Sequence, residues 1–233
     1  MTQVKLVTLD VTNTVIRVLG GVGHQYSNIA KVHGVDLDPD NVTKAFRTKF
    51  KEQNKEFPIF GSKNGLTSRQ WWDSLVQKTL TQSGMDSKND KLSKISQDIC
   101  VHFETEGWVL IPESVSVLQE LKNRNITVGA ISNFDDTLES VLRRMSILHY
   151  FDFVLSAWTV GHAKPDPEIY LKALDMANTT ASESIHVGDD YQNDYVGPKK
   201  VGMQSILFCP DVSNIPTGVK CSITNLSDLL EYV

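Results

Sequence analysis

Hydrophobic and polar positions follow two different patterns along the chain. Residues 4–9, VKLVTL, form a short apolar run rich in β-branched side chains, which is typical of a buried strand. From about residue 22 to residue 105 the apolar positions recur instead with helical spacing, and no segment of this block has a clear strand pattern. Gly34 and Gly84 follow two of its helical segments, at the position where glycine commonly ends a helix. The pattern therefore predicts one strand followed by a helical block.

Beyond this block, short apolar runs alternate with amphipathic segments. The predicted strands are residues 126–132, 151–157, 183–189 and 204–209. The predicted helices are residues 112–125, 136–147, 166–177, 194–203 and 226–233. Strands that alternate with helices of this length indicate a parallel, doubly wound sheet. We therefore predict an α/β fold with a Rossmann-like core, residues 1–18 and 108–233, and an α-helical subdomain, residues 19–107, inserted after the first strand.

Composition narrows the class of protein. The chain has 233 residues and a formal net charge of −5, without the basic stripe that a nucleic-acid partner would require. No apolar run approaches the roughly 20 residues that span a bilayer, and the N-terminal stretch goes directly into a strand instead of a signal peptide. The three cysteines are widely spaced and form no CxxC pair. We expect a soluble intracellular protein, cytoplasmic or in an organelle, without a membrane partner and either monomeric or weakly dimeric.

Polar side chains stand where the predicted strands end. Asp10 ends the first strand, Ser132 and Asn133 end the second, and Asp189 ends the strand at 183–189. Lys164 follows the strand at 151–157 after a few residues. In open parallel sheets the ligand lies outside the carboxyl ends of the strands, near the point where the strand order reverses. We therefore expect these residues to share one crevice.

These residue types fit the handling of a phosphorylated molecule. Crowded carboxylates such as Asp10, Asp189 and Asp194 raise each other's pKa or recruit a cation, and oxygen ligands suit Mg²⁺. Lys164 can face a transferred phosphoryl group, and the Ser132 hydroxyl can bind phosphate oxygens. A carboxylate nucleophile that forms an aspartyl-phosphate is a known covalent strategy, and Asp10, at the tip of a strand, is the natural choice.

Four segments, in order, resemble the motifs of the haloacid dehalogenase-like (HAD) hydrolase superfamily. They are LVTLDVTNT for the Asp-x-Asp-x-Thr motif, AISN for the second motif, GHAKPDPEIY with Lys164 for the third and HVGDDYQND for the fourth. The helical block stands where the family's C1-type α-helical cap is inserted. The segments GLTSRQWW, ISNFD and GPKKVGM further resemble the group of haloacid dehalogenase-like hydrolase domain-containing protein 3.

The resemblance implies a Mg²⁺-dependent phosphatase that acts on a small phosphorylated metabolite. It makes Asp10 the nucleophile and a metal ligand, and it makes the Thr12 backbone carbonyl another ligand. It assigns phosphate binding to Ser132, and to Lys164 the stabilisation of the nucleophile and the phosphoryl group. Asp189 completes the metal site, and Asp194 is a ligand or lies just behind one.

One position departs from the family pattern. Thr12 stands where the family has a second Asp, which protonates the leaving group and then activates water. A hydroxyl does neither well, and general acid–base catalysis is worth about 10²–10⁴ in rate. The residues therefore leave open a slow phosphatase, one that takes its acid from elsewhere, or a binding protein without catalysis. A metal-free dehalogenase, in which Asp10 attacks a halogenated carbon, fits less well because the clustered acids would repel an anionic haloacid.

Several residues carry weaker signals. Asn133 is expected to contact substrate or to support its loop, and Arg69 in RQWW to bind substrate beside an aromatic wall; at least one of the two tryptophans should be core. His186, inside an apolar strand, is interpreted as a satisfied core histidine. His162 and His24 are weak candidates for the site, and Asp190 is given no role. The segment FPIFGSKNG is expected to be a cap loop that closes over the crevice.

Overall fold

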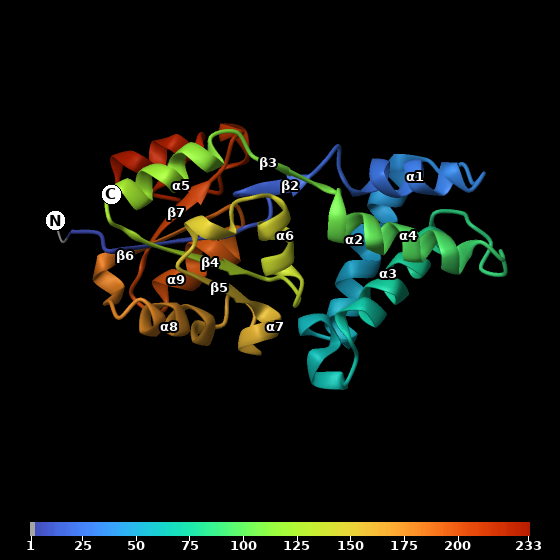
Figure 1. Cartoon of the computed structure of the whole chain (residues 1–233), viewed down its shortest axis with the longest axis horizontal. Coiled ribbons are helices and arrows are strands. Elements are labelled where there is room, and N and C mark those ends of the chain that lie inside the picture. The colour runs from blue at the N-terminus through green and yellow to red at the C-terminus, as the bar shows by residue number, and fades with distance from the viewer. Residues whose placement is uncertain (1–2) are drawn as a thin grey trace. The chain divides into compact units, whose positions relative to one another are not determined.

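The computed structural model describes residues 3–233, and the chain divides into two compact units (Figure 1). The sheet unit comprises Met1–Arg17 and Leu110–Val233, and the helical unit comprises Val18–Val109. The helical unit thus spans the residues expected to be inserted after the first strand. Two short strands, β2 (Ile16–Val18) and β3 (Trp108–Leu110), pair with each other where the chain passes from one unit to the next and returns. Neither strand has a pattern long enough to be predicted from the sequence.

The sheet unit is built on six parallel strands in the order β5-β4-β1-β6-β7-β8. Their bounds are β1 Leu6–Leu9, β4 Thr127–Ser132, β5 Phe153–Ser156, β6 Ser184–Gly188, β7 Gln204–Phe208 and β8 Ser222–Ile223. From β1 the chain builds β4 and β5 on one side and then returns to build β6, β7 and β8 on the other. The predicted α/β fold with a doubly wound parallel sheet is confirmed. The strand order reverses at β1, so a ligand is expected beyond the carboxyl ends of β1, β4 and β6.

Helices cover both faces of this sheet, with α5 on one face and α8 on the other (Figure 1). The α-helices are α5 Ser114–Asn123, α6 Leu138–Arg144, α7 Ala157–Val160, α8 Pro167–Met176 and α9 Gly197–Lys199. The 3-10 helices are η2 Leu148–Tyr150, η3 Ala181–Glu183, η5 Val212–Asn214 and η6 Leu226–Glu231. The α-helix expected at the end of the chain is therefore the 3-10 helix η6.

The helix expected at 194–203 is also different. A π-helical turn, η4 (Tyr191–Val196), comes first, and α9 follows it directly. Pro198 stands in the first turn of α9 and has no backbone N–H with which to continue the preceding hydrogen-bond pattern. The change of helix type brings Asp194 into the π-helical turn, where its side chain is buried.

Packing between α8 and the sheet forms one apolar core. Asp166 caps α8 by accepting a hydrogen bond from the backbone N–H of Glu168, and Pro167 occupies the first helical position. Ile169 and Tyr170, in the first turn of α8, are fully buried. The cluster consists of Leu6, Ile131, Phe153, Leu155, Ile169, Tyr170, Ala173 and Met203. This packing fixes the strands whose ends carry the polar residues.

The helical unit has a second, separate core. Its elements are α1 Val22–Val32, α2 Pro39–Glu56, the 3-10 helix η1 Ile59–Asn64, α3 Ser68–Gln82 and α4 Leu92–Thr105. A reciprocal capping box between Thr67 and Gln70 starts α3. Gly34 and Gly84 have left-handed backbone angles, φ 79° and φ 109°, just after α1 and α3, which confirms the predicted helix ends. Among residues 3–233, no helix is long and apolar enough to cross a membrane.

Candidate active site

Asp10 stands just beyond β1, at the centre of the sheet. Its backbone N–H donates to the carbonyl of Val187 at 2.8 Å, so the β1–β6 pairing continues up to this residue. The chain then turns sharply, because the Val11 carbonyl accepts the N–H of Val15 at 2.9 Å and Asn13 adopts a left-handed φ of 63°. The turn leaves Asp10 buried, with 6% of its surface exposed, and Thr12 half-buried. A strand therefore ends on a carboxylate that the fold holds rigidly.

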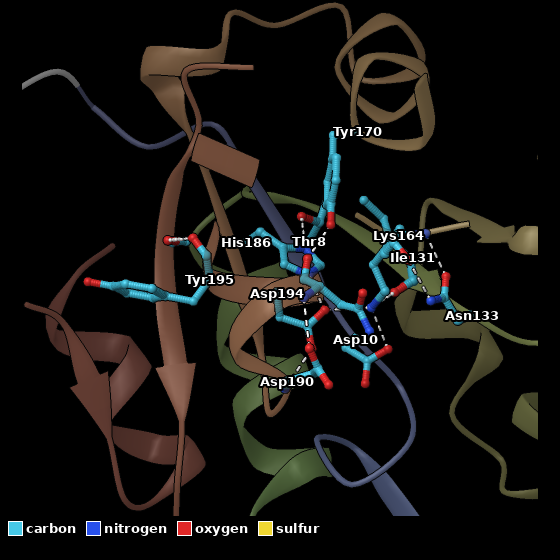
Figure 2. Close-up of polar contacts among 12 residues, drawn as sticks. Thr8, Asp10, Ile131, Asn133, Lys164, Tyr170, His186, Asp190, Asp194 and Tyr195 are labelled. Atoms are coloured by element: carbon cyan, nitrogen blue, oxygen red, sulfur yellow. Dashed lines mark hydrogen bonds and ion pairs between the residues drawn. The ribbon is translucent and has the colours of Figure 1, made fainter. Parts of the chain in front are cut away.

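Lys164 reaches Asp10 from a different loop, which Asn133 holds in place. The Asn133 side-chain oxygen accepts the Lys164 backbone N–H at 2.7 Å, and its amide donates to the Lys164 carbonyl at 2.9 Å. Both ends of the Asn133 amide are thus engaged by the backbone of one residue. This geometry fits the expected support of the loop, and it positions the Lys164 side chain beside Asp10 and the Ile131 carbonyl (Figure 2).

The Lys164 ammonium group is buried between two carboxylates. Its Nζ lies 2.6 Å from Asp10 Oδ1, 2.6 Å from Asp194 Oδ1 and 2.9 Å from the carbonyl oxygen of Ile131. These three acceptors match the three donors of an ammonium group. Burial alone would lower the pKa of Lys164, but the charges of Asp10 and Asp194 outweigh it and raise the pKa. Lys164 is therefore charged and is oriented entirely by protein atoms.

The position of Asp194 depends on two features near the end of β6, the capped π-helical turn and Gly188. Asp190 caps η4 by accepting the N–H groups of Gln192 and Asn193, a role that the sequence did not reveal. Its own backbone N–H donates to Asp194 Oδ2 at 2.9 Å. Gly188 allows the close approach, because a Cβ at that position would lie 2.3 Å from Asp194 Cγ. The π-helical turn and Gly188 together bring Asp194 to the end of β6.

Asp10, Asp189 and Asp194 each place one carboxylate oxygen within 4.8 Å of those of the other two. Lys164 pairs with Asp10 and Asp194, and burial nevertheless raises the pKa of Asp10 to about 6. Partial removal from water, together with the charges of Asp10 and Asp194, raises the pKa of Asp189 to about 7. Burial is the largest cause of both shifts and the neighbouring carboxylates add to it, and a bound cation would stabilise the ionised forms. An all-oxygen donor set of this kind fits Mg²⁺.

A histidine and a threonine lie behind Asp194. His186 is fully buried in β6, and its Nε2 lies 3.0 Å from Asp194 Oδ1. Its Nδ1 lies 2.8 Å from the hydroxyl oxygen of Thr8, its register partner in β1. Although burial acts to raise it, the charge of Lys164 and the hydrogen bond with His186 lower the pKa of Asp194. Burial lowers the pKa of His186, which makes the ring neutral at neutral pH.

Comparison with known proteins identifies the family. A family model described as haloacid dehalogenase-like hydrolase matches residues 4–202. The chain belongs to the haloacid dehalogenase-like hydrolase family. This HAD-like hydrolase is 37% identical over 209 residues to haloacid dehalogenase-like hydrolase domain-containing protein 3 of Xenopus laevis, and the match covers 89% of this chain and 85% of the relative. The resemblance predicted from GLTSRQWW, ISNFD and GPKKVGM is thereby confirmed.

Solved structures share the fold of this HAD-like hydrolase. The 2-haloacid dehalogenase of Pseudomonas syringae pv. Tomato DC3000 superimposes with a TM-score of 0.66 at 24% identity, over 98% of this chain and 97% of that one. The HAD-hydrolase YfnB of Bacillus subtilis, in a structure bound to magnesium, gives a TM-score of 0.73 at 16% identity, over 99% of each chain. Proteins described as dehalogenases and as a magnesium-bound hydrolase therefore use the same fold, and the fold alone does not select between them.

The structure brings most of the predicted site residues of this HAD-like hydrolase together. Asp10, Lys164, Asp189 and Asp194 form one cluster, and Ser132, the last residue of β4, is buried at the same edge of the sheet. Arg69 belongs to α3 of the helical unit, where its guanidinium group donates to Glu104 at 2.7 Å and to the carbonyl of Gln97 at 3.2 Å. Its role in substrate binding stays a prediction.

The structure also gives the surroundings of the residues that had weaker sequence signals. Trp71 is fully buried, as expected for one of the two tryptophans. His162 Nδ1 lies 2.8 Å from Asp166 Oδ2, so the two form a half-exposed pair at the start of α8. His186 is a buried and hydrogen-bonded histidine, as the sequence indicated, but its bond to Asp194 was missed. The signal was present in the sequence, since His186 and Asp194 stand eight residues apart in the same motif segment, HVGDDYQND.

Proposed function

We propose that this protein is a Mg²⁺-dependent phosphatase that acts on a small phosphorylated metabolite through an aspartyl-phosphate on Asp10. The observation that carries the proposal is the bridge from the buried Lys164 ammonium group to both Asp10 and Asp194, with Asp189 beside them. The arrangement holds one carboxylate at a strand tip and leaves a net negative cluster that calls for a divalent cation. A magnesium-bound hydrolase of the same fold supports the choice of cation.

The metal ligands in this proposal are the carboxylates of Asp10, Asp189 and Asp194, with the backbone carbonyl of Thr12. When bound, Mg²⁺ would neutralise charge on the phosphate and on the carboxylates, so that two anions can approach each other. Lys164 adds a fixed positive charge beside Asp10. Because its three donors are already engaged, Lys164 acts by orienting Asp10 and holding it ionised.

The reaction then has two displacements at phosphorus. In the first, a carboxylate oxygen of Asp10 forms a bond to phosphorus, the ester P–O bond breaks, and the leaving alkoxide takes a proton from water. In the second, a water oxygen attacks the same phosphorus, the bond to Asp10 breaks, and inorganic phosphate and the free carboxylate are released. The Ser132 hydroxyl, at the end of β4, is the proposed contact for a phosphate oxygen.

Thr12 sets the expected rate. Both displacements need a group that gives a proton and later accepts one, and a threonine hydroxyl is too weak an acid and base for either. We infer a slow phosphatase whose aspartyl-phosphate is long-lived. The rival from another class is a binding protein that uses the same cluster for a phosphorylated ligand without turnover.

Dehalogenation is the second chemistry to be separated, since solved dehalogenases share the fold. A 2-haloacid is an anion, and Asp10, Asp189 and Asp194 would repel it in the absence of a cation. The carboxylate cluster therefore favours a phosphate ester with Mg²⁺ over a haloacid without it.

The test is phosphate release from a panel of phosphomonoesters with Mg²⁺ or with EDTA, beside halide release from 2-haloacids. Wild type is expected to release phosphate slowly with Mg²⁺ and to be inactive in EDTA. Thr12→Asp should raise turnover by about 10²-fold or more, whereas Thr12→Asn, which has the shape of aspartate but no acid or base, should not. Equal rates for wild type and Thr12→Asp would mean that another group supplies the proton. If neither wild type nor Thr12→Asp releases phosphate, the proposal of a binding protein is favoured. Halide release in EDTA would overturn the proposal of a phosphatase.

A further inference from the structure

Two polar side chains of neighbouring strands form a buried pair beneath the carboxylate cluster. Thr8 of β1 and His186 of β6 are register partners, and neither has any exposed surface. The imidazole is bonded at both nitrogens, to the Thr8 hydroxyl at 2.8 Å and to Asp194 Oδ1 at 3.0 Å (Figure 2). An apolar side chain would fill this place in a strand core without the desolvation that an imidazole suffers. The histidine therefore needs a reason other than packing.

The direction of each hydrogen bond follows from the partners. An ionised Asp194 can only accept, so Nε2 of His186 is the donor in that bond. In the neutral ring Nδ1 is then the acceptor, and the Thr8 hydroxyl donates to it. The alternative acceptor for that hydroxyl, the Ile185 carbonyl, lies farther away at 3.4 Å. Tyr170 packs edge to face on the ring, with centroids 5.6 Å apart and an angle of 80°, and so fixes its plane.

These bonds leave Asp194 little freedom to turn. Its Oδ1 accepts from His186 Nε2 and from Lys164 Nζ, and its Oδ2 accepts from the Asp190 backbone N–H at 2.9 Å. Only the histidine bond links the carboxylate to the interior of the sheet, since the other two come from the loops around it. Without that bond, the carboxylate would be oriented only by segments outside the strands.

We propose that His186, held by Thr8, is a positioning residue of the metal site, which orients Asp194 so that Asp10, Asp189 and Asp194 can bind one cation. The inference rests on the proposed function in one respect, that the carboxylate cluster binds Mg²⁺. On this inference, the metal site includes the pair Thr8 and His186 inside β1 and β6, in addition to the carboxylates at the strand ends. Partners of this kind behind a ligand typically change metal affinity by 10- to 100-fold.

Two pairs of variants separate positioning from packing. His186→Leu removes both hydrogen bonds and keeps an apolar volume, whereas His186→Gln keeps a side-chain N–H near the place of Nε2. Thr8→Val removes the hydroxyl with almost no change of shape, whereas Thr8→Ser keeps it. The dissociation constant of Mg²⁺ alone, measured by calorimetry on the whole chain, should rise about 10- to 100-fold in His186→Leu. It should rise less in Thr8→Val and stay near the wild-type value in His186→Gln and Thr8→Ser.

A spectroscopic signature completes the test. Long-range ¹H–¹⁵N spectra should show His186 protonated at Nε2 in wild type and in Thr8→Ser, with this preference weakened in Thr8→Val. A ring protonated only at Nδ1, or equal Mg²⁺ affinity in all four variants and wild type, would overturn the inference while leaving the phosphatase intact. A wild type that does not bind Mg²⁺ would overturn both. If His186→Leu does not fold, the isosteric threonine pair decides.

Discussion

The two units bury different kinds of side chain. In the sheet unit the buried side chains include ionisable groups, namely Asp10, Asp135, Lys164, His186 and Asp194. In the helical unit, Val18–Val109, all of which the structure describes, the buried polar side chains are uncharged: Ser27, Gln53, Ser68, Thr79 and Ser96. The aromatic contacts of the helical unit are close, with ring centroids of Phe60 and Trp71 5.1 Å apart. The buried side chains of the sheet unit thus include charged groups, whereas those of the helical unit are apolar or uncharged.

The contrast indicates which buried side chains serve the chemistry of the site and which serve the stability of the fold. A buried charge costs free energy unless it is paired and fully hydrogen-bonded, so it is weak evidence for stability and better evidence for chemistry. Apolar burial is the main stabilising contribution to a folded unit. Substitutions in the charged core should therefore affect catalysis and metal binding more than substitutions in the helical core, which should affect stability.

The largest difference between the effect on activity and the effect on stability is expected for Asp10→Asn. Removing the nucleophile should lower Mg²⁺-dependent phosphate release by at least about 10⁴-fold. The unfolding free energy of the metal-free protein at pH 7 should stay equal or rise, because the raised pKa of Asp10 means that its charge opposes folding there. Activity assays and urea unfolding of the same preparation measure both. A marked loss of stability would contradict the assignment of Asp10 to function.

Trp71→Ala should show the opposite behaviour in the helical core. The side chain is fully buried and contacts Phe50, Phe60 and Trp72. Its truncation should lower the unfolding free energy by about 3–5 kcal/mol. Urea unfolding followed by circular dichroism measures the loss, and the half-buried Trp72→Ala is the control with a smaller effect. A loss below about 1 kcal/mol would mean that this cluster does not carry the stability of the unit.

Lys164→Met should show that a residue of the charged core can also affect stability. The substitution keeps the unbranched apolar part of the side chain but leaves Asp10 and Asp194 facing each other without a cation. We expect a loss of about 3 kcal/mol in the metal-free protein, within the range for removing one partner of a buried pair. The double variant Lys164→Met with Asp10→Asn is the control and should recover part of the stability. Additive losses in the double variant would show that the two residues do not interact.

The smallest effect is a pH dependence of the metal-free protein. Between about pH 8 and pH 6 the folded chain holds more protons than the unfolded chain, because the pKa values of Asp189 and Asp10 are raised to about 7 and about 6. The unfolding free energy should therefore rise as the pH falls through this window. The lowered pKa values of His186 and Asp194 act in the opposite sense, below the ordinary values of those groups.

Thermal unfolding in EDTA from pH 8 to pH 6 measures this slope. Saturating Mg²⁺ should reverse it, because protons then compete with the metal for the same carboxylates. Asp10→Asn in EDTA should reduce the slope without removing it. A metal-free protein that loses stability steadily from pH 8 to pH 6 would contradict the raised pKa values of Asp10 and Asp189.

The sequence predicted the parts of the site that topology determines. Asp10, Ser132 and Asp189 stand at strand ends, and parallel strands bring their carboxyl ends to one edge of the sheet. Their meeting therefore follows from the order of strands and helices. The helix ends at Gly34 and Gly84 were predictable for a similar reason, since they depend on one residue's backbone freedom.

The rest of the site depends on contacts that the periodicity of apolar positions along the chain does not encode. That Thr8 lies opposite His186 is a matter of strand register, which a parallel pair separated by 178 residues does not reveal in its local pattern. The π-helical turn that positions Asp194 depends on Gly188 and on the cap from Asp190, and both are set by tertiary packing. Asn133 was expected beside the substrate or supporting its loop, and only the structure shows that both ends of its amide bind the Lys164 backbone.

The central claim is that Asp10 accepts a phosphoryl group with the help of Mg²⁺, and one measurement addresses it without knowledge of the substrate. Beryllium fluoride mimics a phosphoryl group on a carboxylate, and ¹⁹F NMR detects its bound form. Wild type with Mg²⁺ should show bound resonances that disappear in EDTA and are absent from Asp10→Asn. Resonances that persist in Asp10→Asn, or that never form in a folded wild type with Mg²⁺, would contradict Asp10 as the phosphoryl acceptor.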